Sequence, residues 1–589
     1  MKCSYFVFLY SLCVVNAIDP LVFKGSKVFN SKTGQQFYFK GLAYQPKQGV
    51  TFSPQDPLAD EVGCKRDIEL FKDLGINSIR VYEVDSTKNH DVCMKALADA
   101  GIYVILDLPT PLYSISRENP SWDIYLLNKY KMKVDAFYKY SNVAGFIAGN
   151  EVTNTVDTTP ASAFVKASLR DIKSYMKSKN INLPVGYADN DDELIRDSLI
   201  KYFNCGDEPL AIADFYGVNT YRWCGNNNYS NSGYGNMIAP FSNYSVPYLL
   251  TEYGCNTITP RIFSEVASIY GSDMENLTSG GFLFEYSEEP NNYGLVKVSF
   301  GSSNVEKLSD YDTFKKQVSN VDPKGTSLKD YNPSLKNSQC PPVTSSWKVN
   351  DVLPPSPNID VCNCLSESFS CSLPAQFDPS NAVQSKALGD TLSFICGTVD
   401  CSDVSTDTAK GVYGKYSGCT SIQKSNYILS TYYSSNNNDS SYCSVKGLGF
   451  DLIINSNAKK TVTCNSTGDG TVNSDPISSL GLDGSSNGND PSSSTSPSSS
   501  SYITPTGSKT SEQSMSSVSS QSRSVISSTS SHTGSSMASN QNNTSVVTSQ
   551  SQTGSKVSSS LSSTSGVDIN TSNMSVIFTF ISLLAFLSL

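Results

Sequence analysis

Histidine is nearly absent from this chain of 589 residues, which contains only His90 and His532. His532 lies in a Ser-rich tract, so at most one histidine is available to a folded site. Catalytic triads built on histidine and histidine-rich zinc sites both need imidazole groups, and this shortage argues against them. By elimination, the sequence favours carboxylate chemistry, with no metal and no cofactor.

Basic residues are also fewer than acidic ones. Lysine and arginine total 44 against 54 aspartate and glutamate residues, and the formal net charge is −10. Such a balance argues against nucleic acid or an anionic membrane surface as the partner. A neutral polysaccharide is compatible with it.

The apolar run at the N-terminus is short. Residues 1–17, "MKCSYFVFLYSLCVVNA", begin with Lys2 and end in the small-residue pattern Val15-Asn16-Ala17. This order predicts a secretory signal peptide, and the run is too short to favour the alternative of a membrane anchor. The sequons at Asn228, Asn243, Asn276, Asn438 and Asn465 fit the same secretory route and predict a glycoprotein.

The apolar run at the C-terminus, Val576 to Leu589, is too short for a confident membrane span. It follows a polar spacer and a group of small residues, which is the layout of a GPI attachment signal. We expect attachment at Ser563, Ser565 or Gly566 and removal of the tail 566–589; the alternative is a tail-anchored helix. The expected location is the outer face of the cell membrane, the cell wall, or both.

Cysteine is plentiful in one part of the chain. Of the 16 cysteines, Cys3 and Cys13 leave with the signal peptide, and the even number that remains predicts disulfides. Eight of them fall within about a hundred residues, which indicates a small disulfide-held module rather than a metal site. These are Cys362, Cys364, Cys371, Cys396, Cys401, Cys419, Cys443 and Cys464.

Composition divides the chain into segments. A Pro-, Ser- and Asn-rich stretch separates the first large region from the cysteine-rich one, and a Ser/Thr-rich tract after the module cannot bury a core. The predicted organisation is a signal peptide 1–17, a catalytic barrel 18–340, a linker 341–361, a cysteine-rich module 362–464, a Ser/Thr-rich stalk 465–565 and the GPI tail 566–589.

The first large region repeats one pattern, in which short apolar runs alternate with longer amphipathic stretches such as 64–75 and 162–180. Eight strands alternating with helices predict a (β/α)₈ TIM barrel of the α/β class. Not every connection has a helical pattern. The eight runs are "QFYFKGLAY", "INSIRVYEV", "IYVILDL", "VAGFIAGNE", "LPVGYAD", "DFYGVNTY", "PYLLTEYG" and "GGFLFEYS".

Several of these runs end in polar or aromatic residues, and the active site of such a barrel lies at the C-terminal strand ends. A single acid at a strand end is usually a solvated loop residue. Here the fourth run ends in Glu151 and the seventh in Glu252. Glycoside chemistry needs two carboxyl groups that flank the scissile bond, so this pair predicts a glycosidase-type site. Sequence spacing leaves retention and inversion open.

The ordered motifs narrow this prediction. "AGNE" and "LLTEYG" look like the acid/base and nucleophile motifs of retaining barrel glycosidases. Together with "GLAYQP", "IRVYEVD", "VILDLPTP", "VGYADNDD" and "DFYGVNTYRWCG", they resemble the fungal cell-wall 1,3-β-glucanosyltransferases of glycoside hydrolase family 72. The resemblance extends to the cysteine-rich module, similar to β-1,3-glucan-binding modules, and to the GPI layout.

The resemblance implies a role for each matching residue. Glu252 is then the nucleophile and Glu151 the general acid/base. Asn150 binds the 2-hydroxyl of the donor sugar, and Tyr221 lies near the nucleophile. The remaining cleft positions matched by the resemblance are Gln45, Tyr82, Asp107 and Tyr286, for which packing at the barrel rim is the alternative.

The resemblance also implies three disulfides in the barrel region: Cys64–Cys93, Cys205–Cys340 and Cys224–Cys255. The residues alone allow 15 connectivities for six cysteines.

The implied activity is internal cleavage of β-1,3-glucan and transfer of the new reducing end to the non-reducing end of another glucan chain, by a monomer. Two alternatives are an endo-β-1,3-glucanase that uses the same residues and a non-catalytic glucan-binding wall protein. Whether the module binds glucan stays open.

Overall fold

The computed structural model describes residues 18–46, 55–460 and 462–464, which lie in one compact unit. The signal peptide 1–17, the stalk 465–565 and the tail 566–589 fall outside the described residues, so the predictions for them stay predictions. None of the helices described in the structure combines the length and apolarity of a membrane crossing.

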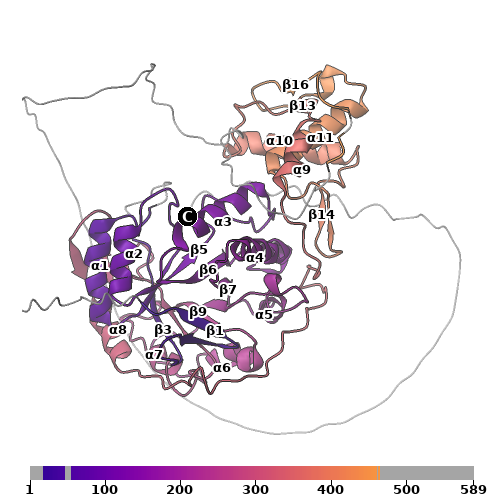
Figure 1. Ribbon diagram of the computed structural model, residues 1–589. Coiled ribbons are helices and arrows are strands. Elements are labelled where there is room, and N and C mark those ends of the chain that lie inside the picture. Colours follow the sequence, from indigo (N-terminus) through magenta and orange to yellow (C-terminus); the bar gives the residue numbers. More distant parts are fainter. Residues whose placement is uncertain (1–17, 47–54, 461, 465–589) are drawn as a thin grey trace, which may run out of the picture. The chain divides into compact units, whose positions relative to one another are not determined.

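Eight parallel strands close into a barrel (Figure 1). Their order around the barrel is β10-β3-β4-β5-β6-β7-β8-β9. The barrel closes where Gly280 of β10 pairs with Phe39 of β3. Each of the eight apolar runs coincides with one strand, and only β7 extends past its run, by Asn190; this agreement confirms the predicted TIM barrel. The strands are β3 Phe39–Ala43, β4 Ser78–Val81, β5 Tyr103–Asp107, β6 Val143–Asn150, β7 Val185–Asn190, β8 Tyr216–Thr220, β9 Tyr248–Tyr253 and β10 Gly280–Leu283.

Helices surround the barrel. The predicted segment 64–75 corresponds to α1, which begins earlier because the Asp60 carboxylate caps it by accepting from the Gly63 amide, and which ends at the left-handed Gly75 (φ 71°). The connections after β8 and β9 contain only short helices: the five-residue α6 and a 3₁₀ helix, Ala239–Asn243, after β8, and the five-residue α7 after β9. The helices are α1 Glu61–Leu74, α2 Asp91–Asp99, α3 Ile124–Phe137, α4 Ala161–Ser178, α5 Arg196–Tyr202, α6 Tyr234–Ile238, α7 Glu265–Ile269 and α8 Ser309–Ser319.

The apolar core has two layers. One fills the inside of the barrel with side chains such as Ile105, Ile147 and Phe282, and the larger one lies between the strands and the helices. Strands buried on both faces are apolar almost throughout. Val28, in the hairpin of β1 (Leu21–Lys24) and β2 (Lys27–Asn30), joins the inner cluster beside Phe39, the first residue of β3. The hairpin therefore covers the N-terminal end of the barrel.

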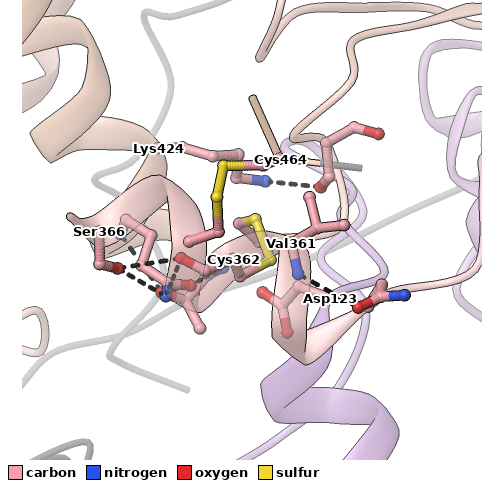
Figure 2. Close-up of a disulfide and its surroundings, with 12 residues drawn as sticks. Asp123, Val361, Cys362, Ser366, Lys424 and Cys464 are labelled. Atoms are coloured by element: carbon pink, nitrogen blue, oxygen red, sulfur yellow. Dashed lines mark hydrogen bonds between the residues drawn. A yellow bond between two sulfur atoms is a disulfide. The ribbon is translucent and has the colours of Figure 1, made fainter. Parts of the chain in front are cut away.

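The cysteine-rich module contains α9 (Ile359–Ser366), α10 (Ala382–Cys396) and α11 (Ser421–Ser435). α10 and α11 contribute to one apolar cluster of the module, and α9 contributes Cys362 and Leu365 to another. In Figure 2 the Ser366 hydroxyl donates to the Cys362 carbonyl oxygen (3.0 Å) beside the disulfides of Cys362 and Cys464. Its disulfides are Cys362–Cys419, Cys364–Cys464, Cys371–Cys443 and Cys396–Cys401. The short strand pairs β13 (Cys371–Ser372) with β16 (Ile453–Ile454) and β14 (Thr406–Asp407) with β15 (Val412–Tyr413) complete it.

The barrel region contains the three disulfides that the resemblance implies, Cys64–Cys93, Cys205–Cys340 and Cys224–Cys255. The second ties the segment before the linker to the chain that follows α5. The small antiparallel pair β11 (Val296–Val298) and β12 (Val305–Lys307) lies between β10 and α8.

Candidate active site

Glu151 follows the last residue of β6 in an unusual backbone conformation. Its φ is 48°, in the left-handed region that residues with a side chain rarely adopt. Its amide donates to the Ala188 carbonyl oxygen (2.9 Å), and its own carbonyl oxygen accepts from Arg117 Nε (3.0 Å). A neighbouring strand and a loop thus hold the backbone in a conformation that costs about 1–3 kcal/mol. Such conformations concentrate at functional sites.

Glu252 lies near the end of β9 and is only 7% exposed. Its Oε1 accepts from Arg80 Nη1 (3.2 Å) and from the Tyr82 hydroxyl (3.0 Å), and its Oε2 accepts from the Tyr221 hydroxyl (2.7 Å). Burial raises the pKa of Glu252 to about 7; the Arg80 guanidinium opposes this rise, and the nearby Glu151 carboxyl adds to it. The three donors favour the ionised carboxylate.

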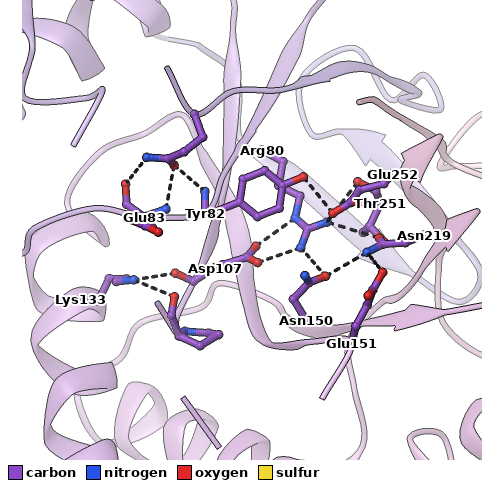
Figure 3. Close-up of polar contacts among 12 residues, drawn as sticks. Arg80, Tyr82, Glu83, Asp107, Lys133, Asn150, Glu151, Asn219, Thr251 and Glu252 are labelled. Atoms are coloured by element: carbon purple, nitrogen blue, oxygen red, sulfur yellow. Dashed lines mark hydrogen bonds and ion pairs between the residues drawn. The ribbon is translucent and has the colours of Figure 1, made fainter. Parts of the chain in front are cut away.

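Arg80 is fully buried at the centre of the site (Figure 3). Its guanidinium forms a bidentate pair with Asp107 (3.0 and 2.8 Å) and also donates to Asn150 Oδ1 (2.9 Å) and to Glu252. Asp107 therefore compensates the charge of Arg80 and orients it. Our sequence analysis missed Arg80. The only signal was a cation within the apolar run "INSIRVYEV".

Two asparagines connect Arg80 to Glu151. Asn219 Nδ2 donates to Asn150 Oδ1 (3.0 Å) and to Glu151 Oε1 (2.8 Å), while its own oxygen accepts from the Thr251 hydroxyl (2.8 Å). Both hydrogen bonds of the Asn150 amide use its oxygen. Within the described part of the chain, Asn150 Nδ2 has no protein partner, so this nitrogen is available to a sugar hydroxyl.

The two glutamates therefore have different environments. Glu252 is buried against a cation and two phenols, whereas Glu151 is partly exposed and accepts a hydrogen bond from a neutral amide. A pair of carboxyl groups whose surroundings differ in this way can divide the roles of nucleophile and acid/base.

Two of the predicted cleft residues have buried side chains that are hydrogen-bonded to other parts of the protein. The Gln45 amide is buried and bound to backbone: its oxygen accepts from the amides of Tyr82 (3.2 Å) and Glu83 (2.8 Å). Tyr286 is fully buried, and its hydroxyl donates to Asp67 Oδ1 (2.5 Å). Direct sugar contact by these two residues stays a prediction that the geometry does not favour. Gln45 instead positions Tyr82.

Aromatic side chains line the site near Glu252. Phe284, two residues before Tyr286, is partly exposed, and so is Tyr293. The centre of the Tyr221 ring lies 6.2 Å from that of Phe284 and 5.6 Å from that of Tyr293. The rings of Tyr221 and Phe284 are nearly perpendicular. Our sequence analysis missed both rings. Cys224–Cys255 links the segments that follow Tyr221 and Glu252.

A family model described as Glucanosyltransferase, of glycoside hydrolase family 72, matches residues 11–322, more than half of the chain. The chain belongs to this family. A second model, described as the X8 domain, matches residues 378–450 within the cysteine-rich module. The motifs that suggested family 72 thus identified it correctly.

Named relatives cover most of the chain. A 1,3-beta-glucanosyltransferase GAS2 of Saccharomyces cerevisiae is 42% identical over 426 residues, which are 69% of this chain and 75% of that protein. The 1,3-beta-glucanosyltransferase of Arthroderma benhamiae is 42% identical over 439 residues, 71% of this chain and 79% of that protein. The structure of Saccharomyces cerevisiae Gas2p in complex with laminaripentaose is 39% identical, with a TM-score of 0.69, and covers 75% of this chain and 99% of that one.

Proposed function

We propose that this family 72 member is a 1,3-β-glucanosyltransferase that cuts β-1,3-glucan internally and joins the new reducing end to the non-reducing end of another chain. The observation that carries the proposal is the pair of unlike glutamates, Glu252 buried against three donors and Glu151 partly exposed beside Asn219. Two relatives bear this activity in their names, and a solved relative contains a laminari-oligosaccharide.

The reaction has two steps. In the first, Glu252 attacks the anomeric carbon of the donor while Glu151 gives its proton to the leaving oxygen, and a glycosyl ester forms on Glu252. In the second, the 3-hydroxyl of the acceptor attacks the same carbon and gives its proton to Glu151, while the ester bond breaks. Asn150 holds the 2-hydroxyl of the donor sugar through its Nδ2.

The remaining polar residues act on the nucleophile. Arg80, Tyr82 and Tyr221 hold the Glu252 carboxylate in line with the anomeric carbon. Asp107 keeps Arg80 oriented, and Gln45 keeps the backbone of Tyr82 in place. These contacts fix the position of the nucleophile, so the site is preorganised for charge that changes during the reaction.

Hydrolysis by an endo-β-1,3-glucanase is the rival reading, because water can replace the acceptor in the second step. Transfer prevails only if the acceptor is held well enough to outcompete water. Good orientation is worth effective molarities of about 10⁵ M or more.

The test is to incubate the pure enzyme with a β-1,3-linked oligosaccharide of one length and to weigh the products. Chains longer than the starting one, with few new reducing ends, are the expected result. Only shorter chains, with one new reducing end for every cut, would establish a hydrolase, and no reaction at all would favour the non-catalytic wall protein.

We also propose that the protein is a secreted, monomeric glycoprotein held at the outer face of the membrane by a GPI anchor. The order of small residues, polar spacer and apolar run at the C-terminus supports the anchor, and the exposed sequon asparagines Asn228, Asn243, Asn276 and Asn438 support glycosylation. Truncation before Ser563 should release active enzyme to the medium. Equal membrane association of truncated and full chains would place the anchor elsewhere.

A further inference from the structure

One side of the Glu252 site is formed by Tyr293, a residue that the reaction described above does not use. Tyr293 lies in the segment between β10 and β11. Its ring centre is 5.6 Å from that of Tyr221 and 5.3 Å from that of Phe284, with interplanar angles of 66° and 75°. Tyr293 stays partly exposed although its ring packs against two other rings. It therefore presents an aromatic surface beside the residue that holds the nucleophile.

The segment that carries this ring is firmly anchored. Arg261, which is 2% exposed, donates through Nη2 to the Tyr293 carbonyl oxygen (2.6 Å) and through Nη1 to that of Phe284 (3.1 Å). Asp310 neutralises Arg261 at 2.7 Å. Asn256 Nδ2 binds the carbonyl oxygens of two further residues of the segment, at 2.8 and 3.1 Å. These contacts thus fix the position of the ring.

The hydroxyl of Tyr293, by contrast, has no hydrogen-bond partner among the residues that the structure describes. Burial raises the pKa of Tyr293, the Arg261 guanidinium opposes this rise, and the Glu252 carboxylate adds to it, which agrees with a position close to the nucleophile. The protein therefore holds the Tyr293 side chain through its ring. A variant that tests the role of Tyr293 must remove this ring.

We propose that Tyr293 is a specificity-determining residue that decides whether a sugar chain or water resolves the glycosyl ester on Glu252. In that step the acceptor 3-hydroxyl oxygen bonds to the anomeric carbon, the bond from this carbon to the Glu252 oxygen breaks, and the hydroxyl proton passes to Glu151. Water follows the same route. An aromatic face stacks on the C–H face of a pyranose ring and orients it, whereas water gains nothing from that surface.

This inference rests on the proposed function, because it names a residue that favours transfer over hydrolysis. The experiment compares wild type with Tyr293→Ala, Tyr293→Phe and the matched control Tyr138→Ala, which removes an exposed tyrosine at the end of α3 (46% exposed). Each enzyme receives an oligosaccharide of one length. The readout is the ratio of elongated chains to new reducing ends, together with total donor cleavage and the KM for added acceptor.

We expect Tyr293→Ala to lower the ratio by about tenfold and to raise the acceptor KM, while donor cleavage falls by less than about threefold. Tyr293→Phe should keep the ratio within about twofold of wild type because its ring is retained. Tyr138→Ala should match wild type. If Tyr293→Ala is not secreted in folded form, Tyr293→Leu, which is apolar but not flat, serves with the same expected ratio.

An unchanged ratio in Tyr293→Ala, or a fall in Tyr293→Phe as large as in Tyr293→Ala, would overturn the inference. These outcomes leave the proposed function intact, because wild type still elongates chains. A wild-type enzyme that yields only shorter chains would instead overturn the proposed function and the inference together.

Discussion

At Glu252, burial and hydrogen bonding act against each other. Burial raises its pKa to about 7, while Arg80, Tyr221 and Tyr82 favour the ionised form. A nucleophile must be ionised, so these donors set the lower end of the active pH range.

Tyr221→Phe tests that balance. Loss of the 2.7 Å hydrogen bond to Glu252 Oε2 should raise the pKa of Glu252 further, because this bond stabilises the carboxylate. The acidic limb of kcat/KM should move to higher pH by about one unit, the size expected for one hydrogen bond to a charged group. Tyr229→Phe, a change in the same connection between β8 and β9, should leave the limb in place. An unshifted limb in Tyr221→Phe would contradict the role of this hydroxyl.

Sequence reasoning found Glu151 and Glu252 because they end apolar runs, and the resemblance added Asn150, Tyr82, Asp107 and Tyr221. It could not separate Phe284 from Tyr286. Both residues follow β10, which ends at Leu283, and they stand two positions apart, so strand alternation would place them on the same side and does not distinguish the partly exposed residue from the buried one. Arg80 was missed because an apolar run does not indicate whether a cation within it contacts a carboxylate.

At the scale of elements, the site depends on the relative position of the ends of β8 and β9. Tyr221 follows β8 and Glu252 lies in β9, and the Cys224–Cys255 disulfide joins the segments behind them. The barrel and its strand order were predictable because local apolar runs and helix patterns agree with the global fold. The short α6 and α7 were not, since these connections carry little helical periodicity.

The Cys224→Ser/Cys255→Ser variant should be less stable by about 3–4 kcal/mol, the loop-closure contribution of a disulfide spanning 31 residues. It should also lose kcat, because the chains behind Tyr221 and Glu252 are no longer linked. Cys396→Ser/Cys401→Ser removes a disulfide that spans 5 residues in the module and should keep wild-type activity on short oligosaccharides. Thermal unfolding and kinetics measure both. Equal activity in the two double variants would rule out a role for the first disulfide in the site.

At the scale of the whole molecule, buried acids make stability depend on pH. Burial raises the pKa of both Glu252 and Glu265 from 4.5 to about 7. The folded state therefore binds more protons than the unfolded state between these values. This stabilising contribution is complete below about pH 4.5 and is lost as the pH rises through about 7. The hydrogen bond from Lys315 lowers the pKa of Asp73 from its ordinary value of 3.8. Asp73 therefore changes the stability only at a pH below this window.

We therefore expect a higher Tm at about pH 5 than at about pH 7.5. Glu265→Gln should reduce the difference in unfolding free energy between the two pH values by about 3 kcal/mol, because the neutral amide does not titrate. Glu69→Gln, whose parent side chain is 71% exposed, should leave the difference unchanged. A Glu265→Gln protein with the full wild-type pH dependence would show that Glu265 is not held protonated.

The central claim is that Glu252 carries the sugar between donor and acceptor. It is tested most directly by the intact mass of Glu151→Gln after incubation with a β-1,3-oligosaccharyl fluoride, whose leaving group needs no acid. This variant lacks its general base and cannot resolve the ester, so we expect its mass to increase by one oligosaccharide. Peptide mapping should locate this addition on Glu252, and the double variant Glu151→Gln/Glu252→Gln should lack it. No adduct on the single variant, or an adduct that persists in the double variant, would contradict the account.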